Sequence, residues 1–189
     1  MPGLPIRISL ALFATLTLSS PARAQDAFAS VRCGSDISRA LIGKKSPRGP
    51  VAATERKHRD IGLKGEGASQ ISDTLFYIGW TLCGREYAFI EGKNDRIRDV
   101  IPFPPHSRQS PGFFGSCTIG GKSLSDAVLA ILANPAPLPA DRHYAFNDST
   151  SLNATSAWRV DDKQARFVAL HEAKIECPRN SIFTVDGGP

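Results

Sequence analysis

The chain has 189 residues, in which 23 lysines and arginines outnumber 18 acids to give a formal net charge of +5. Apolar residues make up 41% and charged residues 22%, so low-complexity disorder, collagen and a coiled coil are excluded for the chain as a whole. A large multidomain protein is also excluded, because a single domain takes roughly 100–200 residues.

The first 24 residues contain the three parts of a secretory signal peptide. Arg7 gives a positive start, an apolar run extends from Ile8 to Leu18, and Ala22-Arg23-Ala24 ends the segment. As a helix this run is too short for the roughly 30 Å hydrocarbon core of a membrane, which disfavours a retained anchor. We therefore expect residues 1–24 to be cleaved, the mature protein to be periplasmic or extracellular in a bacterium, and no membrane span to remain.

The predicted mature chain is only slightly basic. Cleavage after Ala24 removes two arginines and no acid, which leaves 165 residues with 21 positive and 18 negative side chains, a net charge of +3. This excess does not indicate nucleic-acid binding. Residues 39–64, however, contain eight positive side chains and only two acidic ones. Lys57 and Arg59 in this stretch are candidate anion-binding residues. The stretch predicts a solvated basic linker or a surface for an anionic envelope component.

All four cysteines, Cys33, Cys83, Cys117 and Cys177, lie in the predicted mature chain. An even number of cysteines in an oxidising compartment predicts two disulfides. Successive separations of 50, 34 and 60 residues are unlike the closely spaced ligand pairs of structural zinc sites, so we expect neither a metal nor a cofactor. The spacing does not select among the three possible connectivities. As a working expectation, we pair Cys83 with Cys117 and Cys33 with Cys177.

The first half of the mature chain predicts one short helix and a meander. Ser35 or Asp36 is a suitable cap for a helix over residues 37–42, which Gly43 would end. The following residues, 44–67, are predicted to be a basic irregular stretch because of their prolines and glycines. Three segments rich in aromatic and β-branched residues then predict an antiparallel meander with short turns. These segments are residues 75–83, 87–90 and 97–103.

The second half predicts a hairpin with strands at 157–160 and 166–170, the latter continuing through 175–177. Residues 125–134 fit either a helix or a buried strand, and their pattern leaves the choice open. Residues 134–141 are predicted to be a surface loop and residues 181–189 a loose tail. Together the patterns predict a single globular domain over residues 25–180. Its class is β-rich α+β: mainly antiparallel sheet with a meander, a C-terminal hairpin and a short N-terminal helix, held by disulfides.

The most unusual segment is residues 101–114, IPFPPHSRQSPGFF, in which four prolines fix φ and stiffen the chain. A stiff loop loses little conformational entropy on binding, which suits a recognition surface. A connector whose phenylalanines fill the core is the alternative interpretation. If the segment is a recognition loop, its partner-binding residues are His106, Arg108, Phe113 and Phe114.

Familiar catalytic spacings such as GxSxG and HExxH do not occur in the sequence. The sequence therefore favours a non-catalytic binding module that acts on an envelope protein or an anionic envelope component. One alternative is a hydrolase with a dispersed active site that includes His106, and another is a purely structural envelope protein. A pocket holding His106 beside a carboxylate and a hydroxyl would favour the hydrolase, whereas a surface without a pocket would favour the structural protein.

Overall fold

The computed structural model of the protein describes residues 26–139, 142, 149–172 and 174–183. The predicted signal peptide lies outside these ranges. Strands dominate the described residues, with a few short helical segments near the N-terminus, and the β-rich α+β prediction is confirmed. In chain order, the elements are η1 Ala27–Ser30, α1 Ile37–Leu41, α2 Val51–Lys57, η2 Arg59–Ile61, β1 Lys64–Gln70, β2 Leu75–Leu82, β3 Arg85–Gly92, β4 Arg96–Pro102, β5 Gly112–Gly115, β6 Thr118–Ile119, β7 Lys122–Ser123, β8 Val128–Leu132, β9 Ser151–Asp161, β10 Arg166–Leu170, β11 Ile175–Pro178, η3 Arg179–Ser181 and β12 Ile182–Phe183.

The first sheet is an antiparallel meander in the order β1-β2-β3-β4. The predicted strands β2, β3 and β4 are confirmed, and β2 and β3 pair along their full length, from Leu75 opposite Gly92 to Leu82 opposite Arg85. Strand β1 adds to the free edge of β2, with a bulge between Gly65 and Gly67. Because successive side chains of a strand point to opposite faces, the central hairpin buries residues on both of its faces.

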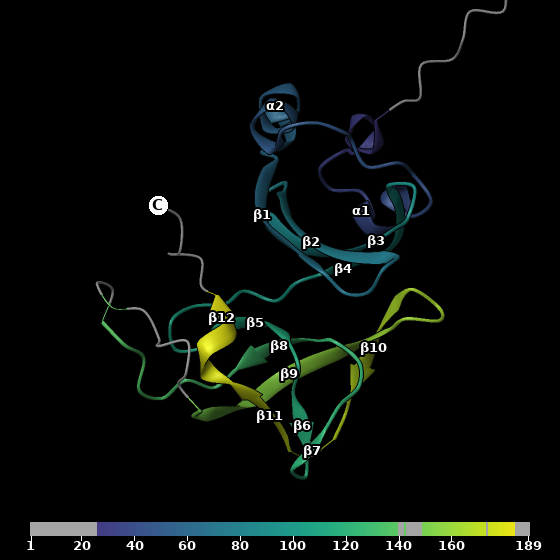
Figure 1. The fold of residues 1–189 in the computed structure, drawn as a ribbon. Coiled ribbons are helices and arrows are strands. Elements are labelled where there is room, and N and C mark those ends of the chain that lie inside the picture. Colours follow the sequence, from purple (N-terminus) through teal and green to yellow (C-terminus); the bar gives the residue numbers. More distant parts are fainter. Residues whose placement is uncertain (1–25, 140–141, 143–148, 173, 184–189) are drawn as a thin grey trace, which may run out of the picture.

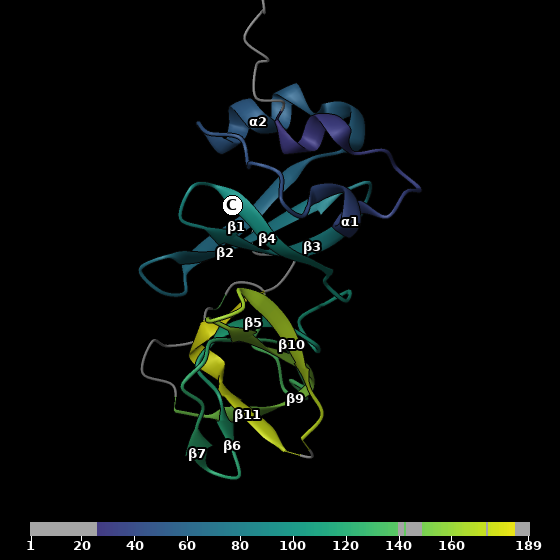
Figure 2. The ribbon, with the colours of Figure 1, turned by 90° about the vertical axis from the view of Figure 1, so that its right-hand side faces the viewer.

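Each face of the meander packs against a different layer, as Figure 1 shows, with α1 and α2 above the curved sheet and the second sheet below it. Trp80 and Phe89 belong to the upper cluster, which includes residues of η1 and α1. Tyr77 and Ile90 belong to a cluster shared with the second sheet. Figure 2 shows the same stacking from the side. The two sheets therefore share a core through the lower face of the meander.

The second sheet has the order β12-β5-β8-β9-β11-β6-β7, with β10 also paired to β9. Residues 125–134 contain β8, a strand in which all five residues are buried. Its Leu129 and Ile131 face the meander, whereas Val128 and Leu132 fill a separate cluster within the second sheet. An apolar strand covered on both faces lacks polar alternation, which explains why its pattern also fits a helix.

The predicted hairpin of β9 and β10 is confirmed, but its outgoing strand does not continue through 175–177. Those residues belong to a separate strand, β11, which pairs with the other end of β9, where Cys177 lies opposite Leu152. The predicted loose tail begins too early, because Ile182 and Phe183 pair with β5 as β12. Residues 184–189 of that tail, and residues 140–141 of the predicted surface loop, lie outside the described residues.

The basic stretch 44–67 is irregular only in part: residues 44–50 lie outside helices and strands, whereas the rest holds α2, η2 and the start of β1. Its Pro50 stands immediately before α2, where a proline is compatible with the start of a helix. The helix predicted at 37–42 is confirmed as α1, and the Asp36 carboxylate caps it by accepting a hydrogen bond from the Arg39 amide at 3.0 Å.

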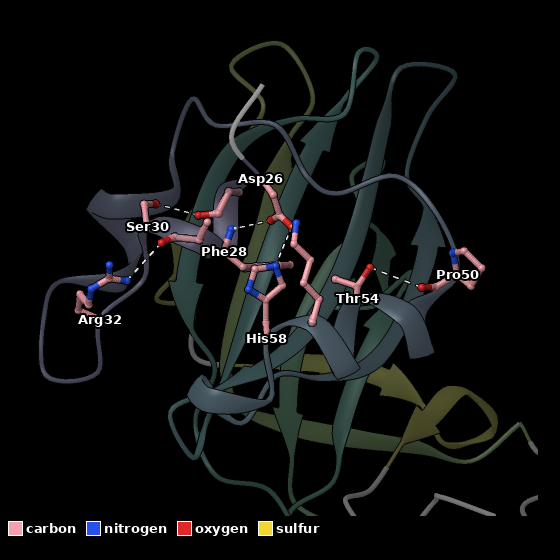
Figure 3. A network of polar contacts seen from close by, with 10 residues as sticks. Asp26, Phe28, Ser30, Arg32, Pro50, Thr54 and His58 are labelled. Carbon is pink, nitrogen blue, oxygen red and sulfur yellow. Dashed lines mark hydrogen bonds and ion pairs between the residues drawn. The ribbon is translucent and has the colours of Figure 1, made fainter. Parts of the chain in front are cut away.

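Asp26 fixes the N-terminal segment onto the helical layer (Figure 3). Its carboxylate accepts hydrogen bonds from the Phe28 amide at 2.9 Å, the Lys57 ammonium at 2.8 Å and His58 Nε2 at 2.7 Å. Burial alone would raise the pKa of Asp26, but these hydrogen bonds outweigh burial and hold the pKa below its usual value. The Phe28 ring also meets the rings of His58 and Trp80 edge-on, which connects this polar cluster to the upper core.

The four cysteines form two disulfides, as predicted, but the expected connectivity is wrong. The bonds are Cys33–Cys83 and Cys117–Cys177. The first joins the N-terminal segment to the residue that follows β2, and the second joins the residue before β6 to β11, within the second sheet. The expected pairs would instead have linked the meander and the N-terminal segment to the second sheet. The pairing of β6 with β11 brings Cys117 and Cys177 together, whereas Cys33 lies in a turn and reaches Cys83 through the tertiary fold. Sequence spacing records neither of these long-range contacts.

Peptide mapping of the purified protein without reductant should recover a Cys33–Cys83 peptide and a Cys117–Cys177 peptide. Because each disulfide closes a loop of 50 or 60 residues, removing one pair by double alanine substitution should lower the free energy of unfolding by about 2–4 kcal/mol. Recovery of a Cys83–Cys117 peptide, or of four free thiols, would contradict this pairing.

Candidate functional site

A cavity of about 650 Å³ opens where the end of the β2–β3 hairpin meets the proline-rich connector. Strand β1, the hairpin and the connector each contribute to its wall. Its lining residues are Lys64, Glu66, Thr81, Gly84, Arg85, Glu86, Phe103, Pro104, Pro105 and His106. A concave site with a few converging polar groups is the default candidate for ligand binding.

Strand register brings the polar residues of the cavity onto one face of the meander. Thr81 lies opposite Glu86 on β3 and opposite Lys64 on β1. The bulge in β1 lets Glu66 reach the same face, where it accepts a hydrogen bond from the Thr81 hydroxyl at 2.7 Å. The Lys64 ammonium also donates to the Glu66 carboxylate, at 3.4 Å. Strands β1, β2 and β3 thus each contribute polar side chains to one cluster on this face.

The connector places His106 over this face. The amide of Phe103, the first residue after β4, donates to the carbonyl oxygen of Glu86 at 2.9 Å, and this bond fixes the connector to β3. His106 follows two prolines, and its Nδ1 lies 3.6 Å from Oε2 of Glu86. The side chains of His106 and Glu86 are only 4% and 14% exposed, so the pair is largely shielded from water.

Gly79 on β2 allows three neighbouring side chains to pack close to its backbone. A Cβ atom at this position would lie 3.2 Å from Cβ of Glu66, 3.3 Å from the Tyr77 hydroxyl oxygen and 3.7 Å from Oε1 of Glu86. The missing side chain therefore lets the Tyr77 hydroxyl and the two glutamates approach one another. A strand glycine often marks such a close approach.

The environment shifts the pKa of Glu86, His106 and Tyr77. Burial, and then the negative charge of Glu66, raises the pKa of Glu86 to about 7, although Lys64 acts in the opposite direction. Burial lowers the pKa of His106, which keeps its ring neutral at pH 7. Burial, together with the charges of Glu86 and Glu66, also raises the pKa of Tyr77. A carboxyl that titrates near neutrality can bind a polar ligand or exchange a proton with it.

Of the four residues predicted in the proline-rich segment, His106 lines the cavity and the other three do not appear in its described lining. Arg108 donates to the Leu138 carbonyl oxygen at 2.6 Å. Phe113 lies on β5 with 0% exposure, and its role as a partner-binding residue stays a prediction. Phe114 stacks on the Tyr77 ring, with centroids 4.4 Å apart. Phe113 thus belongs to the core of the second sheet, and Phe114 packs, partly buried, against the core shared with the meander.

Lys57 and Arg59, the predicted anion-binding residues, lie in the helical layer away from the cavity. The Lys57 ammonium is occupied by its ion pair with Asp26 at 2.8 Å, and His58 between them is buried. The Arg59 side chain donates to the carbonyl oxygen of Arg56 at 3.3 Å. The two predicted cations therefore have different partners. Lys57 is paired with the Asp26 carboxylate, whereas Arg59 lies at the surface and donates to a backbone carbonyl oxygen.

Sequence reasoning missed Glu66, Thr81 and Glu86. Glu86 shares its strand face with Ala88 and Ile90, both of which are buried. An ionisable residue in phase with buried apolar residues is the signal that points to it. It is easily overlooked because Gly84-Arg85-Glu86 also fits a polar turn.

All four cysteines are in disulfides, as expected for a chain that matures in an oxidising environment. Across the described parts of the chain, no three His, Cys, Asp or Glu side chains are grouped so that they could hold a metal ion. No helix among the described residues has the length and apolar character needed to span a membrane.

Comparisons with known protein families, with curated proteins and with solved structures find no match to this chain.

We expect Glu86→Gln to change the pH dependence of stability. Because the folded pKa of about 7 exceeds the ordinary 4.5, ionisation of Glu86 opposes folding. The contribution of Glu86 to the free energy of unfolding is highest below its unfolded pKa, declines as the pH rises from about 4.5 to 7, and stays low above pH 7. As the pH is raised from 5 to 8, the free energy of unfolding of the variant should therefore increase by about 1–3 kcal/mol relative to that of wild type, as measured by urea denaturation. Parallel stability profiles for the two proteins would contradict the raised pKa.

Proposed function

We propose that the protein is an exported, periplasmic or extracellular binding protein, whose cavity at Glu86 and His106 takes a small polar ligand. The carrying observation is that this shielded pair lines a cavity of about 650 Å³, within the usual range for small-molecule sites. Such a cavity is the feature that a purely structural envelope protein would lack. The two disulfides and the signal-peptide pattern of residues 1–24 support the assignment to an exported protein.

The walls of the cavity are suited to selective binding. The meander wall is part of a sheet buried on both faces, and the connector wall is stiffened by Pro104 and Pro105. Preorganised walls lower the entropy lost on binding. An envelope protein or an anionic envelope component as a further partner stays a prediction.

Binding can be tested by following amide resonances of the purified mature protein while a library of small amines, carboxylates, alcohols and sugars is added. We expect ligands to shift the resonances of Gly84, Arg85 and His106. His106→Asn should weaken such binding about tenfold or more, because a buried hydrogen-bonding group is lost or misplaced. His171→Asn, which changes an exposed histidine outside the cavity lining, is the matched control. Shifts confined to other surfaces would reject the proposal.

A hydrolase is the second candidate, because the cavity holds His106 beside the Glu86 carboxylate and near the Thr81 hydroxyl. In this case Glu86 would accept a proton from water as the water attacks an ester carbonyl. We then expect slow turnover of p-nitrophenyl acetate with a rate that rises through about pH 7, where Glu86 ionises. Glu86→Gln should lower the rate roughly 100-fold or more. Turnover equal to that in buffer, or equal in the variant, would exclude this candidate.

A further inference from the structure

We infer that the ligand of this cavity is a small organic amine, bound as its ammonium ion between Glu66 and Glu86 with its apolar part toward the connector. This inference rests on the proposed function and adds a ligand class to it. It follows from three features of the cavity: the placement of two carboxylates, an ammonium already bound by one of them, and the apolar surface of two connector prolines beside them.

The two carboxylates come from different strands and face the same space. A Cβ atom built on Gly79 would lie within 3.7 Å of both side chains, at Cβ of Glu66 and at Oε1 of Glu86. Their mutual repulsion is the second cause, after burial, of the raised pKa of Glu86. A cation placed near both would relieve the repulsion and favour the ionised form of Glu86.

The chain itself shows that an ammonium group fits beside one of these carboxylates, that of Glu66. Lys64 Nζ lies 3.4 Å from Oε2 of Glu66, and its charge lowers the pKa of Glu86. The Lys64 side chain is 60% exposed, so it covers the carboxylates only partly. A ligand ammonium would make the same kind of contact from the cavity side, nearer to Glu86.

The other cavity surfaces favour an organic cation over a metal ion. In the described residues, no three potential metal-binding side chains are grouped, so the two glutamates and His106 do not form a coordination site. Pro104 and Pro105 instead supply apolar surface, and Phe103 behind them is buried in the core shared with the second sheet. The His106 ring packs on the buried Phe103 ring, with centroids 5.3 Å apart, so the core supports the connector wall of the cavity.

The inferred binding depends on pH through Glu86. Lys64 and Glu66 face this group from β1, Tyr77 from β2, Arg85 lies beside it, and His106 faces it from the connector. With a pKa of about 7, Glu86 is roughly one-tenth ionised at pH 6 and nine-tenths ionised at pH 8. An amine that stays protonated across this range should therefore bind up to about tenfold more weakly at pH 6.

The test compares three probes of similar shape: benzylamine as the cation, benzyl alcohol as the neutral analogue and benzoate as the anion. Each is titrated to millimolar concentration into the purified mature protein at pH 6 and pH 8, with amide resonances as the readout. We expect benzylamine to bind at Gly84, Arg85 and His106 at least about tenfold more tightly than the other probes, and more tightly at pH 8.

Two isosteric variants locate the charge that matters. Glu86→Gln should weaken benzylamine binding about tenfold or more at pH 8 and remove its pH dependence. Glu91→Gln is the matched control, because Glu91 lies on the same strand, is also held at a raised pKa by burial, and pairs with Phe76 away from the cavity. It should leave benzylamine binding unchanged, and the amide spectra report whether each variant is folded.

The outcomes separate the ligand class from the proposed function. Tighter binding of benzyl alcohol or benzoate at the cavity would overturn the amine inference and leave a binding protein with another ligand. Equal benzylamine binding by wild type and Glu86→Gln would also overturn it. Failure of all three probes to shift any cavity resonance would reject the amine inference, whereas failure of the whole small-molecule library would reject the binding function as well.

Discussion

The fold depends on burial of the β2–β3 hairpin on both of its faces. On one face Phe89 packs with the N-terminal helical layer, and on the other Ala88 and Ile90 pack toward the second sheet. Neighbouring residues of one strand thus belong to two different cores. The usual alternation of apolar and polar residues is absent in the middle of the hairpin, because neither face is left to solvent. Both layers are organised around this one element.

The cavity forms where this double burial ends. Around Tyr77, whose ring stacks on Phe114, the second sheet covers the lower face of the meander. Toward the hairpin turn that face is covered by the connector instead, and its residues change from apolar ones to Thr81 and Glu86. The site therefore combines a rigid sheet with incomplete cover. This explains a carboxyl that is shielded enough to have a raised pKa and still lines an accessible space.

Locally encoded elements could be predicted from the sequence. The helix capped by Asp36 and the meander over residues 75–103 are specified by neighbours a few positions apart, and the structure agrees. Strand β1 was missed, because its sequence KGEGASQ has neither an apolar alternation nor β-branched residues. It is a strand because the edge of β2 offers it hydrogen bonds, a tertiary effect that overrides weak local preference. The expected disulfide pairing was wrong for a related reason, because tertiary contacts that the sequence spacing does not record bring the cysteines together.

The candidate site shows the same division between local and long-range information. His106 could be selected from the sequence by its residue type within a stiff loop, but Glu66 and Glu86 reach it only through strand register and a bulge. Glu86 and Glu91 are both glutamates on β3, and burial raises the pKa of both, so neither residue type nor burial distinguishes them. Their environments differ: Glu91 has a hydrogen bond from Ser46, whereas Glu86 lies beside a second carboxylate and a neutral imidazole at a cavity. The chemical capacity of Glu86 therefore comes from its position in the sheet.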